Sequence, residues 1–297
     1  MIDEPRARTV DAGDVRLAVH ERGDEANPTV VLVHGYPDTK DVWTDVASRL
    51  AARFHVVTYD VRGAGASTAP KDRAAYDLER LTDDFLAVAE ATSPEQPVHL
   101  VGHDWGSIQG WEFATAPRTA GRVASFTSIS GPCLDHIGIW IRDRVRRPTL
   151  RGLGAVAGQA LRSWYITVFQ LPLLPELAWR TVVPRRLPQA IARMEGSTPR
   201  APAPTLPSDG LHGINLYRRN MPRRLRRPRR DAYAHAPVQV FVVNGDPFVS
   251  PRLYEDLERW VPELRKRHLD AHHWVPRTQP ETLAKWIEEF VDEVGGR

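Results

Sequence analysis

Short runs of apolar, mostly β-branched residues alternate along the chain with longer stretches in which apolar residues recur at every third or fourth position. The short runs are typical of buried strands, and the longer stretches are typical of helices that lay one face on a sheet. The predicted strands are Thr29–Val33, His55–Tyr59, Val98–Val101, Val123–Ile129, Val238–Val243 and Arg265–Leu269. The predicted helices are Asp41–Arg53, Leu78–Thr92, Pro251–Trp260 and Glu281–Val294. This alternation predicts an α/β fold with a mostly parallel central sheet flanked by helices.

The alternation is interrupted between the fourth and the fifth predicted strand. The intervening residues are rich in proline and arginine, and they show helical spacing at Ala155–Phe169 and Pro184–Met194. We therefore expect a core made of residues 1–132 and 237–297, and a helical cap made of residues 133–236 that is inserted late in that core.

The cap also carries most of the positive charge. The net charge of the whole chain is +3, but residues 133–236 contain 19 arginines and only 6 acidic residues. The densest run, from Arg223 to Arg230, is compatible with contact to anionic lipid and equally with an ordinary solvated surface. Peripheral membrane contact through the cap and a homodimer are therefore expectations for the partners of this chain, whereas nucleic acid is not expected.

Composition narrows the class of protein further. The single cysteine, Cys133, has no partner for an internal disulfide, and no cluster of histidines and cysteines indicates a metal site. No stretch reaches the ~18 consecutive apolar residues that a membrane span needs, and the N-terminus lacks the apolar segment of a signal peptide. We expect a cytoplasmic protein that needs no metal or organic cofactor.

A Gly-x-Asp-x-Gly segment follows the strand predicted at Val98–Val101. Gly102 and Gly106 flank Asp104 there, and a helical pattern begins directly afterwards. Such a strand-to-helix turn presents its central residue as a nucleophile, and the flanking positions must be small because larger side chains would clash. An aspartate is ionised at neutral pH and can attack an sp³ carbon without a base, forming an ester. The alternative is an aspartate that only caps a helix.

Partners for Asp104 follow other predicted strands. The backbone N–H groups of Tyr36 and Trp105 are expected to hold the oxyanion when the ester is hydrolysed. Asp246 follows the strand at Val238–Val243, and two histidines, His272 and His273, follow the last strand. The order of nucleophile, acid and histidine predicts that one histidine is the base and that Asp246 orients it.

These motifs resemble those of the α/β-hydrolase-fold epoxide hydrolases, and the resemblance covers nearly the whole chain. The segment His34–Pro37 (HGYP) resembles their HGxP oxyanion segment, residues 60–67 (DVRGAGAS) resemble their DxRGxGxS turn, and residues 102–106 (GHDWG) match their aspartate elbow. The resemblance assigns the base to His273, although His272 stands where the family usually has glycine. It also extends to the N-terminal hydrolase half of bacterial proteins that carry a short-chain dehydrogenase domain.

Two cap tyrosines complete the resemblance. Tyr165 lies four residues before a Phe-Gln pair, and Tyr217 lies in a segment, NLYR, that resembles the family's NWYR with Leu216 in place of tryptophan. In that family the two tyrosines protonate the oxygen of the opening epoxide, and a phenol with a pKa near ~10 can do so as the C–O bond breaks. The alternative for each tyrosine is ordinary packing of the cap.

The resemblance implies an enzyme that opens a lipophilic epoxide to a vicinal diol through an ester on Asp104. The residues expected to contact the substrate are His34, Pro37, Trp140, Trp164 and Phe169. Two other functions stay open. A haloalkane dehalogenase uses the same elbow but needs side-chain N–H donors for the halide, of which Trp105 supplies one, and a non-catalytic binding module would use the arginine-rich cap.

Overall fold

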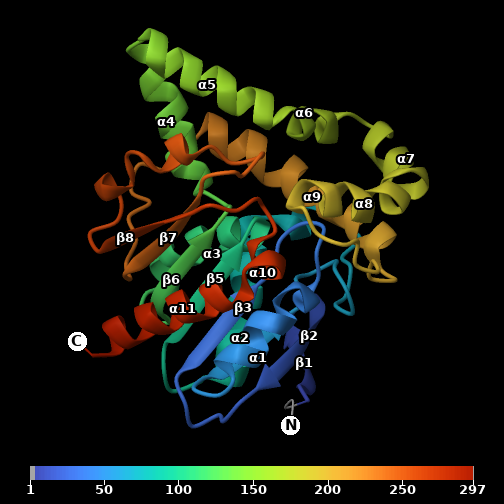
Figure 1. Cartoon of the computed structure of the whole chain (residues 1–297), viewed down its shortest axis with the longest axis vertical. Coiled ribbons are helices and arrows are strands. Elements are labelled where there is room, and N and C mark those ends of the chain that lie inside the picture. Colours follow the sequence, from blue (N-terminus) through green and yellow to red (C-terminus); the bar gives the residue numbers. More distant parts are fainter. Residues whose placement is uncertain (1–3, 297) are drawn as a thin grey trace.

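The computed structural model describes residues 4–296. They form one eight-stranded sheet with helices on both faces, and a helical cap lies over the carboxyl ends of the parallel strands (Figure 1). The strand order is β1-β2-β4-β3-β5-β6-β7-β8. Strands β3 to β8 are parallel to one another, whereas β2 runs antiparallel to both of its neighbours, β1 and β4. The strands are β1 Arg6–Ala12, β2 Val15–Arg22, β3 Thr29–Val33, β4 His55–Tyr59, β5 Val98–His103, β6 Val123–Ile129, β7 Val238–Val243 and β8 Leu264–Leu269.

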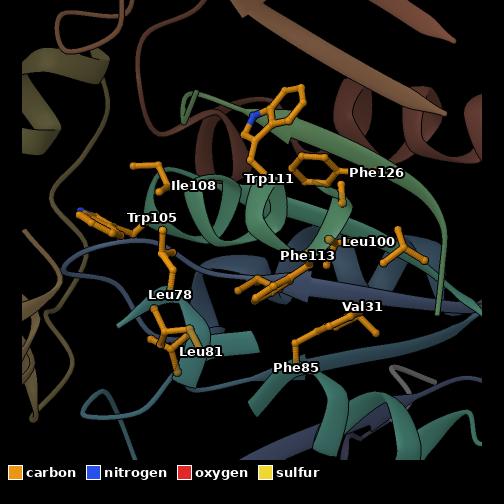
Figure 2. Close-up of a cluster of buried hydrophobic side chains, with 14 of the residues drawn as sticks. Val31, Leu78, Leu81, Phe85, Leu100, Trp105, Ile108, Trp111, Phe113 and Phe126 are labelled. Carbon is orange, nitrogen blue, oxygen red and sulfur yellow. The ribbon is translucent and has the colours of Figure 1, made fainter. Parts of the chain in front are cut away.

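Alternate residues of the central strands enter the two layers of the core. In β3, Val31 and Val33 pack in the layer that contains α2 (Leu78–Thr92) and α3 (Trp105–Thr115). Figure 2 shows part of this layer, including Phe85 and Phe113, whose rings stack with centroids 4.5 Å apart. The residues between them, such as Leu32, pack in the opposite layer with α1 (Thr44–Leu50) and α11 (Pro280–Gly295). A strand buried on both faces explains why its sequence is continuously apolar.

The six predicted strands are all present, and β5 and β8 are slightly longer than predicted. The antiparallel strands β1 and β2 were missed, although the buried Val15, Leu17 and Val19 alternate with less buried positions in β2. The helix predicted at Pro251–Trp260 was wrong. Two 3₁₀ helices, η4 (Pro251–Tyr254) and η5 (Leu257–Arg259), form instead, and because the buried Leu253, Tyr254, Leu257 and Trp260 also fit the spacing of an α-helix, the apolar pattern did not distinguish the two.

The helix predicted at Asp41–Arg53 begins as a 3₁₀ helix, η1 (Lys40–Trp43), and continues as α1. After His273 a short helix, α10 (Val275–Thr278), leads into α11. Two further 3₁₀ helices, η2 (Arg73–Tyr76) and η3 (Pro117–Thr119), lie in the connections on either side of β5.

Six helices lie between β6 and β7, in the region predicted to form the cap. They are α4 Leu134–Arg146, α5 Leu150–Arg162, α6 Trp164–Gln170, α7 Leu174–Thr181, α8 Val183–Glu195 and α9 Leu206–Arg226. The single helical stretch predicted at Ala155–Phe169 is divided at Ser163, whose hydroxyl accepts a hydrogen bond of 2.8 Å from the Gln159 side chain. Within residues 4–296, no helix is both long and apolar enough to cross a bilayer.

Part of the arginine run fastens the cap to the core. The guanidinium of Arg224 lies 3.0 Å from Glu112 and 3.3 Å from Asp135, and that of Arg229 lies 2.8 Å from both carboxylates. Burial raises the pKa of Glu112, and the two arginines oppose that effect. These arginines are therefore ion-pair partners of buried carboxylates, and the solvated-surface interpretation does not apply to them.

We expect Arg224→Met to destabilise the fold strongly, because it leaves Glu112 and Asp135 buried with only one cation between them. The loss in the free energy of unfolding should be about 3 kcal/mol. Urea denaturation followed by circular dichroism measures it. The matched control is Arg223→Met, whose side chain is 56% exposed and pairs with carboxylates at 3.6 and 3.9 Å, and should cost less than about 1 kcal/mol. Equal losses in the two variants would contradict the role given to Arg224.

Candidate active site

Asp104 lies in a sharp turn between β5 and α3. Its backbone has φ 53° and ψ −120°, a conformation that non-glycine residues rarely adopt. A Cβ atom on Gly102 would lie 2.4 Å from the carbonyl oxygen of Gly106, and one on Gly106 would lie 2.0 Å from that of Val33. Both flanking positions therefore require glycine. The Asp104 side chain accepts no capping hydrogen bond from α3, so the helix-cap alternative does not account for it.

The Asp104 carboxylate lies between a backbone donor and an imidazole. The N–H of Tyr36 donates to Oδ1 of Asp104 over 2.7 Å, and Nε2 of His273 lies 3.6 Å from Oδ2. Trp105 is the first residue of α3, so its N–H has no acceptor within the helix. The structure thus brings the two predicted oxyanion donors to the nucleophile position.

His273 is held from behind by a second carboxylate. Its Nδ1 lies 3.0 Å from Oδ2 of Asp246, while Oδ1 of Asp246 accepts hydrogen bonds from the N–H groups of Phe248 and Val249 at 2.8 and 3.1 Å. The neighbouring His272 is exposed, with Nδ1 3.2 Å from the carbonyl oxygen of Gly245. Of the two candidate histidines, the structure therefore places only His273 beside Asp104.

The two carboxylates determine the charge of the imidazole. Burial alone would lower the pKa of His273, but Asp246 and Asp104 outweigh it and raise the pKa to about 10. For Asp246, burial opposes ionisation, yet the imidazole holds the pKa of this carboxyl below its usual value. In the free protein at neutral pH, His273 is therefore an imidazolium between two carboxylates.

A second histidine supports the first, and the sequence analysis gave it no role. Nε2 of His103 lies 2.9 Å from the carbonyl oxygen of His273, and the two rings are 4.9 Å apart. Burial lowers the pKa of His103 to about 4, so at neutral pH this ring is uncharged and donates its N–H to that carbonyl. Its position directly before Asp104 in the GHDWG segment was the feature of the sequence that could have indicated this role. His103 therefore holds the backbone of His273.

An enclosure of aromatic rings covers the Asp104 carboxylate. The Tyr217 ring lies edge-on to those of Trp105, Tyr36 and Tyr165, with centroids 4.9, 5.3 and 5.9 Å apart, and Tyr165 also contacts Phe248. Burial raises the pKa of both Tyr165 and Tyr217, and the Asp104 charge raises it further. Both phenols therefore keep their protons at neutral pH. The enclosure brings the two predicted cap tyrosines together above the predicted nucleophile.

Three of the five residues expected to contact substrate lie in or beside the site. Phe169 belongs to the enclosure, 4.9 Å from the Tyr217 ring. His34 instead braces the oxyanion segment, with Nδ1 2.8 Å from the Gly35 carbonyl oxygen and Nε2 accepting the N–H of Val61 over 3.0 Å. Pro37 lines the small cavity beside Tyr36 and a larger hollow under the cap.

Trp140 and Trp164 are not brought to the site, and this corrects the expectation for both. Trp164 is 65% exposed because Tyr165 and Phe169, four positions apart on α6, occupy the inner face of that short helix. Trp140 is a buried residue of α4 that packs with Ala155. The guanidinium of Arg144 lies over the Trp140 ring, 4.1 Å from the ring centroid.

The cavities show that the enclosure is closed in this structure. A hollow of about 600 Å³ is lined by α8, the following loop and Arg277, and neither Asp104 nor His273 lines it. The cavity beside Tyr36 and Trp105 has a volume of only about 10 Å³. The candidate site is therefore identified by the residues around Asp104 and not by cavity volume.

One group of possible metal ligands occurs among the described residues. Glu21, Glu25 and His55 have ligand atoms within 4.8 Å of one another. His55 begins β4, so this group lies at the amino edge of the parallel strands, whereas Asp104 follows the carboxyl end of β5. Both nitrogens of His55 already have partners, Thr29 and Glu21, at 3.1 and 2.9 Å. The group is separate from the candidate active site.

Comparison with known proteins agrees with this architecture. Residues 28–278 match the model of the α/β hydrolase fold family, and the chain belongs to that family. A solved structure of an epoxide hydrolase from Bacillus megaterium in complex with an inhibitor superposes with a TM-score of 0.79 over 97% of this chain and 100% of that one, at 23% identity. The predicted fold class is confirmed.

Two curated relatives come from Mycobacterium tuberculosis (strain ATCC 25618 / H37Rv). The protein named "Probable oxidoreductase EphD" is 39% identical over 300 residues, which are 98% of this chain and 50% of that protein. "Epoxide hydrolase A" is 36% identical over 170 residues, which are 57% of this chain and 48% of that protein. The chain thus spans about half the length of EphD.

We expect Asp104→Asn to lower the pKa of His273, because one of the two carboxylates beside the imidazole loses its charge without changing shape. The folded pKa of about 10 exceeds the ordinary value of 6.5, so this group's contribution to stability is complete below pH 6.5 and is lost as the pH rises through 10. The variant should lose less stability across that window. NMR titration of the His273 ring and urea denaturation at several pH values measure the two effects.

The matched control is Asp41→Asn, which removes a carboxylate that is 69% exposed and pairs with Lys40. It should leave the His273 titration unchanged. An unchanged His273 pKa in Asp104→Asn would show that Asp104 does not hold the imidazolium.

Proposed function

We propose that this chain is an epoxide hydrolase that opens lipophilic epoxides to vicinal diols. The observation that carries the proposal is a carboxylate at a strained turn, with an imidazole on one side and two protonated phenols, those of Tyr165 and Tyr217, packed above it. The names of Epoxide hydrolase A and the Bacillus megaterium enzyme, and the resemblance of the motifs, support it. The aromatic walls favour an apolar substrate.

The first step uses Asp104 and the tyrosines. An oxygen of the Asp104 carboxylate attacks one epoxide carbon from behind, forming a C–O ester bond while the bond from that carbon to the epoxide oxygen breaks. The electron pair of the broken bond stays on the epoxide oxygen, which takes a proton from Tyr165 or Tyr217. An alkoxide is a poor leaving group, so this proton is what makes opening feasible at neutral pH.

The second step uses His273. Formation of the ester removes the Asp104 charge, so the imidazolium keeps one neighbouring carboxylate, its pKa falls, and it releases its proton, which restores the tyrosine that protonated the epoxide oxygen. The neutral imidazole then takes a proton from water, whose oxygen attacks the ester carbonyl, and the N–H groups of Tyr36 and Trp105 hold the oxyanion. The acyl C–O bond then breaks, and the leaving alkoxide takes the proton of the carboxylic acid formed on Asp104. The diol leaves, Asp104 is again a carboxylate, and His273 is again an imidazolium.

A haloalkane dehalogenase remains the second candidate, on one observation. Nε1 of Trp105 is buried and makes no hydrogen bond of good geometry within the described residues, although it interacts with the Tyr217 phenol, so it could also donate to a halide. The phenol of Tyr36, by contrast, donates to the carbonyl oxygen of Gly210 over 2.9 Å and supplies no second halide donor. The tyrosine pair would also have no role in dehalogenation, so epoxide opening is favoured.

The ester should accumulate in His273→Gln, because the first step needs no base and the second does. After incubation with a lipophilic terminal epoxide, intact-protein mass spectrometry should show an increase equal to the whole epoxide mass, and peptide mapping should place it on Asp104. Asp104→Ala is the matched control and should show no increase.

The same measurement separates the alternatives. An alkyl adduct formed only from a haloalkane would make the chain a dehalogenase. No adduct from either compound, together with an inactive wild-type protein, would favour a non-catalytic binding module.

We expect Tyr165→Phe and Tyr217→Phe to slow the first step and to leave the second unchanged, because only epoxide opening needs their protons. In single-turnover experiments the rate of ester formation should fall at least about a hundredfold in the double variant. Tyr233→Phe, at an exposed tyrosine of the same chain, is the control and should behave as wild type. A double variant that forms the ester at the wild-type rate would remove the tyrosines from the mechanism.

A further inference from the structure

The outer surface of the cap carries an unusual concentration of exposed apolar side chains. Among the described residues, eleven large apolar side chains are exposed, and ten of them lie between residues 145 and 182. They are Val145, Leu150, Leu153, Leu161, Trp164, Leu171, Leu173, Leu174, Leu177 and Val182. Figure 1 shows α5, α6 and α7 in succession along the outer edge of the cap, with α9 between them and the sheet. Large apolar side chains that are exposed in such numbers on one part of a surface indicate an interaction site.

Helix α5 shows that this exposure is organised. Leu150, Leu153 and Leu161 are 95%, 44% and 76% exposed, and with Ala157 they recur at intervals of three and four along one face. The other face is fixed to the core, because Gln159 donates to the carbonyl oxygen of Phe248 and accepts the N–H of Ser250, both near 3 Å. A helix that is apolar on a second, outward face needs a partner there.

The charge around these side chains identifies the partner. Residues 145–194 contain eight arginines and one acidic residue, Glu176, a net charge of +7. All eight arginines are exposed, and Glu176 is already paired with Arg218 at 2.5 Å. Within the described residues no carboxylate pairs with Arg146, Arg147, Arg180, Arg185, Arg186 or Arg193. The exposed side chains of residues 145–193, which we call the outer cap face, therefore combine ten large apolar groups with six cations that lack a carboxylate partner among the described residues.

We propose that the outer cap face binds the surface of an anionic lipid bilayer. The leucines and Trp164 would enter the boundary between headgroups and acyl chains, while the arginines bind lipid phosphates along its edge, as in amphipathic helices that lie in a membrane surface. A second copy of this chain is a poorer partner, because two faces of the same positive charge repel each other. A bilayer supplies both the apolar interior and the negative charge.

Helix α6 places this surface next to the candidate active site. Trp164 lies on the outer cap face, whereas Tyr165 and Phe169 belong to the aromatic enclosure over Asp104. A lipophilic substrate dissolved in the bilayer would thus be one helix away from the catalytic tyrosines. This last point rests on the proposed function, whereas binding to lipid is tested without any substrate.

Co-sedimentation with vesicles tests the proposal. The full chain should bind vesicles of equimolar phosphatidylcholine and phosphatidylglycerol more tightly than phosphatidylcholine alone, and high salt should weaken the binding. The variant L150S/L153S/L161S should bind at least about tenfold more weakly. R146Q/R147Q/R151Q should lose the preference for anionic vesicles. The matched control is Tyr233→Ser, which removes the one large exposed apolar side chain outside the outer cap face and should bind as wild type.

A second measurement follows binding of the wild-type chain, so its main result does not depend on how the serine and glutamine variants fold. Trp164 is the one exposed tryptophan of the nine in the chain, so lipids brominated on their acyl chains should quench its fluorescence, and Trp164→Phe should abolish most of that quenching. Absence of wild-type binding to anionic vesicles would overturn the proposal. A dimer in analytical ultracentrifugation that L150S/L153S/L161S dissociates would also overturn it, because a second copy would then cover this face.

Discussion

The turn at Asp104 is the constraint on which the rest of the site depends. A carboxylate can face the end of β3 only if the chain reverses within one residue after β5, and the positive φ of Asp104 achieves this reversal. The reversal brings the start of α3 close to β3, which is why the flanking glycines admit no Cβ. In this position the Asp104 carboxylate accepts a hydrogen bond from the N–H of Tyr36. Backbone strain at this residue is thus balanced by packing and by one charge-assisted hydrogen bond.

Charge interactions link the turn at Asp104 to residues that follow β7 and β8, the last two strands at one side of the sheet. Asp246 and His273 follow β7 and β8, and both are buried, so neither would be stable there as an isolated charge. Two carboxylates on either side of one imidazolium carry a net charge of −1 in the resting site. In the proposed mechanism, formation of the ester on Asp104 removes one of these two negative charges, the remaining pair is neutral, and the pKa of His273 falls. His103, uncharged and bonded to the carbonyl of His273, keeps that base in place without adding charge.

The sequence predicted the core better than the cap, for a physical reason. Strands buried on both faces are continuously apolar, and the elbow and triad residues follow their carboxyl ends, so local pattern and chemistry identify the same positions. The cap helices are apolar on outward faces too, and apolar spacing then no longer indicates which side faces the core. Trp164 and Tyr165 are adjacent in sequence, yet one is exposed and the other joins the enclosure. The neighbours of Phe248 and His103 likewise depend on tertiary contacts that no local pattern encodes.

The arginines of the cap divide into two populations with opposite physical roles. Arg224 and Arg229 near the end of α9 compensate the buried Glu112 and Asp135, and their energetic contribution depends on the low dielectric of that interface. Six arginines of the outer cap face, Arg146, Arg147, Arg180, Arg185, Arg186 and Arg193, are exposed and pair with no carboxylate among the described residues, and their charge acts through a field that salt screens within about 10 Å. Composition alone counts both populations together as one basic cap. Because these two groups of arginines lie on different parts of the cap, the cap can be fixed to the core by buried ion pairs and still present a positively charged outer face.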